Sequence, residues 1–103
     1  MKKIMKLENM VAIITGSGGG IGRAVALRYA KEGAKCVVVD INGKNADLVA
    51  KEIKSFSGNV LNLEMDVREQ SDIDKTINLT LKSFNTIDIL FNNAGIFDMA
   101  PFF

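Results

Sequence analysis

A cluster of glycines is the first stretch of this sequence whose residue types and spacing suggest chemistry. The segment TGSGGGIG at 15–22 directly follows the apolar run MVAIIT at 10–15, and mostly good helix formers follow it at 21–32. Each glycine costs conformational entropy on folding, so such a cluster indicates that the backbone needs φ > 0 or a close approach there. A helix N-terminus has unpaired N–H groups and a partial positive charge. The glycines therefore predict a phosphate-binding turn.

An acidic residue at the end of the next apolar run adds a second chemical group. Asp40 ends the run KCVVVD at 35–40, and it lies 18 residues after Gly22. In dinucleotide-binding folds a carboxylate at this place accepts hydrogen bonds from the adenosine ribose. The competing phosphate-binding motif, the P-loop, requires a lysine directly after its last glycine, and Arg23 stands there instead. The pair of motifs therefore favours a dinucleotide site.

Alternating strand and helix patterns must position these groups. Apolar runs predict strands at 10–15, 35–40, 59–66 and 87–93, and three of them are nearly continuous, as in a parallel sheet covered on both faces. Helical patterns fill the intervals. The chain is thus predicted to be α/β, with a Rossmann-like doubly wound parallel sheet in the strand order 3-2-1-4.

The predicted helices have recognisable ends and faces. Gly33 is suited to terminate the first helix, and Ser71 with Asp74 resembles a capping box at the start of the third. Apolar faces at helical spacing comprise Ala46, Val49, Ala50, Ile53 and Phe56 in the second helix, and Ile73, Ile77, Thr80, Leu81 and Phe84 in the third.

Composition excludes several other functions. The chain has 103 residues, 48% of them hydrophobic, and a net charge of +1, which predicts one globular domain and no nucleic-acid partner. No apolar stretch approaches the roughly 18 residues of a membrane span, and the first ten residues have no signal-peptide core. Because Cys36 is the single cysteine, no intrachain disulfide can form, which favours a cytoplasmic location. Cys36 itself is expected to be a small buried apolar residue. Without histidine, no Cys/His zinc site and no Ser-His-Asp triad can form.

The order of the motifs resembles the short-chain dehydrogenase/reductase family. TGSGGGIG is similar to its Thr-Gly-x-x-x-Gly-x-Gly motif, MDV at 65–67 to its adenine contact, and NNAG at 92–95 to the motif after its fourth strand. The resemblance covers nearly the whole chain but only the first half of that family's fold. It implies cofactor-binding roles for Gly16, Ser17, Gly18, Gly19, Gly20, Ile21 and Gly22 at the phosphates, Asp40 and Ile41 at the ribose, Asp66 and Val67 at the adenine, and Asn92, Ala94 and Gly95 along the cleft.

The resemblance implies NAD rather than NADP as the cofactor. A 2′-phosphate requires a nearby Arg or Lys and is repelled by a carboxylate such as that of Asp40. The next residues, Ile41 and Asn42, are neutral. At position 19, where NADP-dependent members often carry a basic residue, this chain has glycine.

No catalytic residue is predicted. The family's acid–base chemistry uses a tyrosine followed four residues later by lysine, whereas the only tyrosine, Tyr29, precedes Gly33 at that spacing and is expected to pack. Residues 1–103 are therefore expected to form a single NAD-binding half-domain, truncated before the catalytic segment. The alternative is a non-catalytic nucleotide-binding module. A Rossmann-like methyltransferase would leave MDV and NNAG unexplained.

The segment after NNAG gives a narrower indication of substrate. NNAGIFD-x-AP at 92–101 most resembles polyol dehydrogenases, while reductases of acyl carrier protein substrates or of diketones remain open. The resemblance implies a small-molecule alcohol or ketone as the substrate of the complete enzyme. It also implies that a full-length member forms a homo-oligomer.

Overall fold

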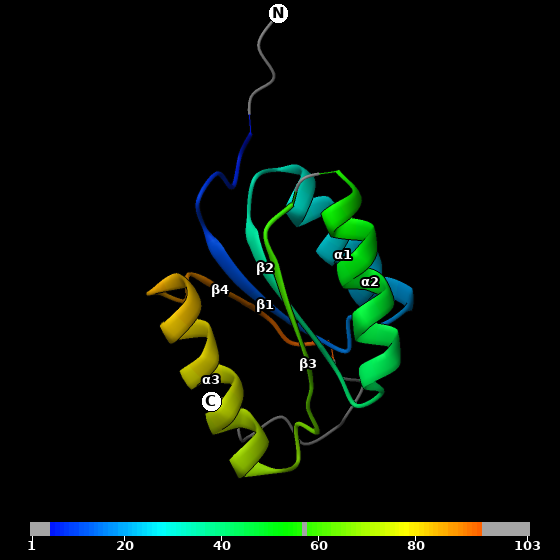
Figure 1. Cartoon of the computed structure of the whole chain (residues 1–103), viewed down its shortest axis with the longest axis vertical. Helices are drawn as coiled ribbons and strands as arrows, with labels where there is room; N and C mark the ends of the chain where they lie inside the picture. Colours follow the sequence, from blue (N-terminus) through cyan, green and yellow to red (C-terminus); the bar gives the residue numbers. More distant parts are fainter. Residues whose placement is uncertain (1–4, 57, 94–103) are drawn as a thin grey trace, which may run out of the picture.

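A four-stranded parallel sheet with helices on both faces organises the chain (Figure 1). The computed structural model describes residues 5–56 and 58–93. The elements in chain order are β1 (Val11–Thr15), α1 (Gly20–Lys31), β2 (Lys35–Asp40), α2 (Gly43–Ser55), β3 (Val60–Glu64), α3 (Gln70–Phe84) and β4 (Ile89–Phe91). The strand order β3-β2-β1-β4 confirms the predicted Rossmann-like topology.

Two hydrophobic clusters form on opposite faces of the sheet because neighbouring residues in a strand alternate in direction. Helices α1 and α2 cover one face, where Ile14 and Val38 pack with Ala26 and Ile53. Helix α3 covers the other face (Figure 1), where Ile73 packs with buried strand residues. Both faces of β1 and β2 are thus buried, as their continuous apolar runs predict.

The C-terminus of α1 confirms the role predicted for Gly33. Its φ of 94° is left-handed, and its N–H donates to the Ala30 carbonyl at 3.1 Å. The Ala34 N–H donates to the Tyr29 carbonyl at 3.1 Å. These two bonds form a Schellman motif, which ends the helix and directs the chain into β2.

The predicted capping box of α3 is wrong. The N-cap residue is Glu69, without a side-chain cap, and Ser71 lies inside the first turn. Asp72 at the third helical position instead accepts a hydrogen bond from the Asp66 N–H at 3.0 Å. The first turn of α3 therefore anchors the loop that precedes it.

Two of the predicted apolar positions are also wrong. Phe56 is the exposed C-cap residue of α2, and Leu81 is exposed on α3. Thr76 is buried on α3 instead, because its hydroxyl donates to the Asp72 carbonyl at 2.9 Å and so satisfies its own polar group. The third predicted strand, 59–66, ends earlier, at Glu64, where the chain turns toward α3.

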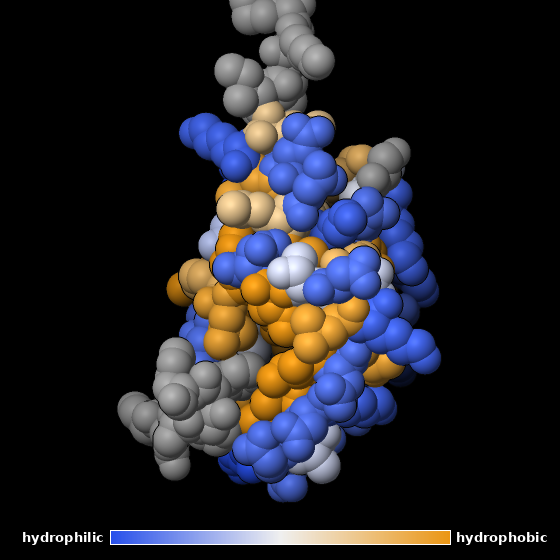
Figure 2. Space-filling view, turned by 90° about the vertical axis from the view of Figure 1, so that its left-hand side faces the viewer, coloured by the Kyte–Doolittle hydropathy of each residue, from blue (hydrophilic) through white to orange (hydrophobic). Residues whose placement is uncertain are grey.

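Strand β4 is the edge of the sheet beside β1. Figure 2, which shows the side of the molecule where β4 and α3 lie in Figure 1, has a band of apolar residues across its centre. Leu90 in the middle of β4 is 38% exposed. Before the strand, Asp88 and Val11 exchange two hydrogen bonds of 2.8 and 2.9 Å, which fix the start of β4. No helix in the described part of the chain is long and apolar enough to span a membrane.

Candidate functional site

The candidate site lies along the edge where the carboxyl ends of the four parallel strands meet. The turn after β1 holds the predicted glycine cluster at this edge. Gly16 has φ 60°, a conformation that residues with a Cβ rarely adopt. A Cβ on Gly22 would lie 2.2 Å from the Gly16 carbonyl oxygen, so α1 can start this close to the turn only with glycine there.

Ser17 fixes the turn after β1 through hydrogen bonds to the strands. Its side chain is buried, its hydroxyl donates to the Ile14 carbonyl at 2.8 Å, and it accepts the Val39 N–H at 3.0 Å. The Ser17 N–H donates to the Val39 carbonyl at 3.0 Å. The hydroxyl and the backbone N–H of Ser17 thus join the turn after β1 to β2, and neither remains free to donate to a ligand.

The outer part of the turn is open. A Cβ at Gly19 or Gly20 would meet nothing within 4 Å, and Ile21 is 68% exposed. Gly19 is the N-cap residue of α1; it provides no side-chain cap, and the first turn has no acidic residue. The first N–H groups of a helix have no partner within it. This terminus can therefore receive an anion.

Asp40 lies directly beside the glycine turn. Its Oδ2 accepts the Gly18 N–H at 2.9 Å, and its Oδ1 accepts the Asn42 N–H at 2.9 Å. A Cβ on Gly18 would lie 2.6 Å from the Cβ of Asn45 and 2.8 Å from Asp40 Oδ2. A carboxylate has about four acceptor positions, so Asp40 retains capacity for ribose hydroxyls. Ile41, 62% exposed, follows it on the surface.

Asn42 and Glu64 belong to the same corner and were not among the predicted site residues. Asn42 caps α2, because its Oδ1 accepts the Asn45 N–H at 3.2 Å. Glu64 pairs with Asp40 in the register of β2 and β3, and its Oε1 accepts the Gly43 N–H at 3.3 Å. The cap could have been found as an asparagine before a helical pattern. Glu64 could be recognised as part of this corner only from the register of β2 and β3 in the structure.

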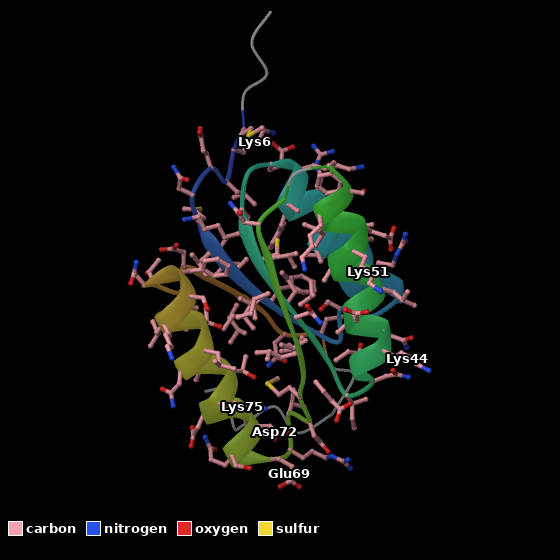
Figure 3. All side chains as sticks on the ribbon, viewed as in Figure 1. Lys6, Lys44, Lys51, Glu69, Asp72 and Lys75 are labelled. Carbon is pink, nitrogen blue, oxygen red and sulfur yellow. The ribbon has the colours of Figure 1, made fainter. Side chains whose placement is uncertain are left out.

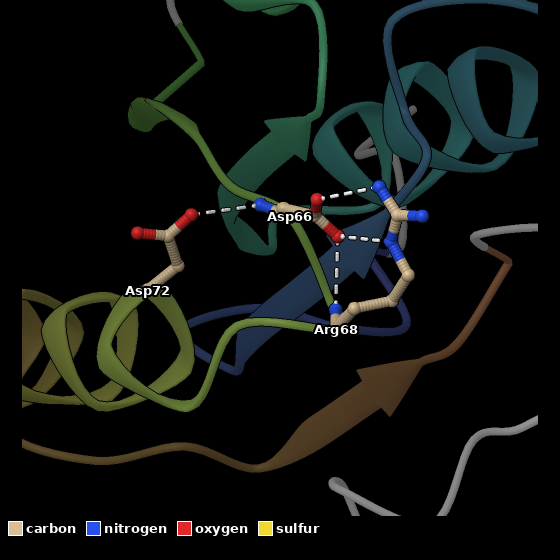
Figure 4. Close-up of polar contacts among 3 residues, drawn as sticks. All are labelled: Asp66, Arg68 and Asp72. Carbon is tan, nitrogen blue, oxygen red and sulfur yellow. Dashed lines mark hydrogen bonds and ion pairs between the residues drawn. The ribbon is translucent and has the colours of Figure 1, made fainter.

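The turn after β3 holds Asp66 in a fixed position (Figure 4). Its carboxylate accepts hydrogen bonds from the Arg68 Nε at 3.0 Å, Nη2 at 2.8 Å and backbone N–H at 2.9 Å. The Arg68 side-chain hydrogen bonds, followed by its backbone N–H, lower the pKa of Asp66 to about 2. The Val67 side chain is buried in the cluster under α3. Only its backbone can therefore face an adenine ring.

Strand β4 meets the glycine turn through Thr15. The Thr15 hydroxyl donates to Asn92 Oδ1 at 3.0 Å and accepts the Asn93 N–H at 2.8 Å. Asn92 Nδ2 is buried and finds no hydrogen-bond partner among the described residues, so its amide NH2 group is available at this edge. Ala94 and Gly95, the other predicted residues of this motif, lie outside the described residues.

The described residues offer binding groups but no reactive one. Tyr29 packs edge-on against Phe91, with ring centroids 6.5 Å apart, as predicted. Cys36 is buried, and burial raises the pKa of its thiol to about 12. Within residues 5–56 and 58–93, no group of three metal-ligating side chains could hold an ion.

Comparison with known proteins identifies the family. Residues 10–103 match the family described as short chain dehydrogenase. The chain belongs to the short chain dehydrogenase family. Its predicted resemblance is thereby confirmed, and the chain is part of an oxidoreductase family that uses NAD or NADP.

Several relatives show how much of a short chain dehydrogenase this chain represents. It is 42% identical over 97 residues to the sorbitol dehydrogenase of Cereibacter sphaeroides and to the galactitol 2-dehydrogenase of Agrobacterium fabrum. These alignments cover 94% of this chain and 37% of each relative. A crystal structure of hydroxysteroid dehydrogenase from Escherichia coli matches with a TM-score of 0.84 and 34% identity, over 87% of this chain and 38% of that one. The chain thus spans little more than a third of these dehydrogenases.

The geometry of the described residues at this edge is compatible with a dinucleotide. The open turn at Gly19 and Gly20 leaves space for a pyrophosphate at a helix terminus without a side-chain cap. Asp40 provides acceptors for a ribose beside it. Asn92 provides an amide donor toward the β4 end of the same edge.

Proposed function

We propose that this chain is the cofactor-binding N-terminal part of an NAD-dependent short chain alcohol or polyol dehydrogenase. The observation that carries the proposal is the 2.9 Å hydrogen bond from the Gly18 N–H to Asp40, which sets a carboxylate beside the open terminus of α1. The bound nicotinamide ring supplies the hydride exchange with a secondary alcohol or ketone. The chain's own residues bind and orient the dinucleotide.

Each predicted residue has a part in this binding. The turn 16–22 holds the pyrophosphate through the backbone N–H groups at the start of α1, because those of Ser17 and Gly18 already donate to Val39 and Asp40. Asp40 and Ile41 hold the adenosine ribose, and Asp66 with the Val67 backbone flanks the adenine. Asn92 binds toward the nicotinamide, and the family motif gives the same role to Ala94 and Gly95, which lie outside the described residues.

NAD is preferred over NADP on grounds of charge. The carboxylate of Asp40 repels a 2′-phosphate on the ribose that it binds. Ile41 and Asn42 add no positive charge. Lys44, the nearest cation along the chain, lies on the outer side of α2, away from the sheet (Figure 3).

The substrate that we propose for the complete enzyme is a polyol or a related secondary alcohol. The motif NNAGIFD-x-AP supports it, as do relatives named sorbitol dehydrogenase and galactitol 2-dehydrogenase. The free Cys36 supports a reducing, cytoplasmic location. We expect the complete enzyme to be a homo-oligomer.

A non-catalytic nucleotide-binding module is the second candidate. One observation favours it: within residues 5–56 and 58–93 the site consists of hydrogen-bonding groups suited to hold a nucleotide. Both candidates bind NAD. Turnover of sorbitol or galactitol by the complete protein that contains these residues, followed by the absorbance of NADH, distinguishes them: turnover would exclude the module, and its absence in a protein that binds NAD would favour it.

Mapping of NAD onto the chain by amide NMR tests the binding shared by both candidates. We expect saturable shifts at Gly18, Gly19, Gly20 and Asn42. Amides at the opposite end of the sheet, such as that of Gly33, provide an internal control that stays unmoved. Shifts confined to that opposite end, or none at all, would refute the proposed site.

A further inference from the structure

Two carboxylates stand side by side where β2 and β3 end. Asp40 and Glu64 are partners in the parallel register, so their side chains project from the same face of the sheet. Asp40 accepts the Asn42 N–H, and Glu64 accepts the next N–H, that of Gly43. A Cβ on Gly43 would lie 2.9 Å from Glu64 Oε1. The Glu64 side chain therefore lies directly against the turn that leads into α2.

The two helix termini at this edge differ in what they offer an anion. At α1, the N-cap Gly19 provides no side-chain acceptor. At α2, the N–H groups of Asn42, Gly43 and Asn45 are already bonded, to Asp40 Oδ1 at 2.9 Å, Glu64 Oε1 at 3.3 Å and Asn42 Oδ1 at 3.2 Å. A phosphate finds free donors at α1, whereas at α2 these three N–H groups are taken and two negative charges face it.

We propose that Glu64 is a specificity-determining residue that excludes cofactors carrying a 2′-phosphate, acting together with Asp40. This inference rests on the proposed function, because it takes the ribose to lie at Asp40. A 2′-phosphate extends from that ribose over the turn into α2. There it would compete with Glu64 for the Gly43 N–H and lie near the charge of the Glu64 carboxylate. NAD lacks the phosphate, so its binding leaves the hydrogen bond between Glu64 and the Gly43 N–H in place.

The variant Glu64→Gln separates charge from structure. Glutamine keeps an oxygen that can accept the Gly43 N–H and removes the negative charge. We expect calorimetric titration of the chain to show NADP binding strengthened roughly three- to tenfold and NAD binding changed less than twofold. Glu64→Asp retains the charge and is expected to keep the wild-type preference.

Glu8→Gln is the matched control. It makes the same change in net charge at an exposed position before β1, at the opposite end of the sheet. If Glu64→Gln leaves the ratio of NADP to NAD affinity unchanged, or shifts it no more than Glu8→Gln does, the inference is wrong while NAD binding still supports the proposed function. If the wild-type chain binds neither cofactor, both the proposed function and the inference are wrong.

Discussion

Replacement of Gly22 by alanine tests whether close approach, rather than flexibility, requires glycine at the start of α1. The added Cβ would lie 2.2 Å from the Gly16 carbonyl oxygen, 2.8 Å from the Gly16 carbonyl carbon and 3.0 Å from Asn93 Nδ2. Two of these atoms belong to the backbone of the β1–α1 turn. Relief of the clash therefore requires the turn and the helix to separate.

The expected loss of stability follows from two opposing effects. Overpacking of a tight site costs about 1–3 kcal/mol, and a backbone clash this short favours the upper end. The higher helix propensity of alanine stabilises the folded chain by at most about 1 kcal/mol relative to glycine. The net effect is a loss of about 2 kcal/mol. For a domain of this size, about 1 kcal/mol corresponds to a shift in Tm of roughly 4–8 °C, so Tm should fall by about 8–16 °C.

Thermal unfolding followed by circular dichroism measures the effect, with Gly19→Ala as the matched control. Gly19 has an extended backbone, with φ −174°, and an added Cβ there meets nothing within 4 Å. We expect Gly19→Ala to leave Tm within about 3 °C of the wild type. Equal Tm values for Gly22→Ala and the wild type, or equal losses for both variants, would refute the packing argument.

Three further predictions concern other parts of the chain. Arg68→Gln should raise the pKa of Asp66 from about 2 toward its ordinary 3.8, which carboxyl NMR would measure. The stability lost in this variant should be largest above about pH 4 and should vanish as the pH falls through about 2, as thermal unfolding would show. Cys36 should resist thiol reagents until the chain unfolds, and rapid labelling of the folded chain would contradict its burial. Leu90→Lys on the edge strand should reduce self-association in light scattering, and unchanged mass would show that β4 does not recruit other chains.

The fold could be predicted, as could the positions of the glycine turn and of Asp40 at the candidate site, because local sequence determines both. Continuous apolar runs identify buried parallel strands, and the glycine cluster before a helical pattern identifies the turn after β1. Asp40 follows from its place at the end of β2. These features depend on residues close together in the chain, where strand ends, turns and helix starts have characteristic residue types.

The remaining features depend on contacts between distant segments. Glu64 reaches the turn into α2 only because β3 lies beside β2 in register with it. Val67 stays a predicted site residue through its backbone alone, because its side chain enters the core under α3. Ser71 and Asp74 have capping-box spacing, but Asp72 is the residue that bonds to the preceding loop. Tertiary packing decides each of these cases, and the spacing of residues alone cannot.

Calorimetric titration of NAD into the wild-type chain and into Asp40→Ala tests the central claim most directly. We expect one site per chain, weakened in the variant by roughly 1.5–3 kcal/mol, or about 10- to 150-fold in Kd, because a charge-assisted hydrogen bond to the ribose is lost. Asp74→Ala, which removes an exposed carboxylate from α3, should leave Kd unchanged. Equal NAD affinity in the wild type and in a folded Asp40→Ala chain would contradict the account.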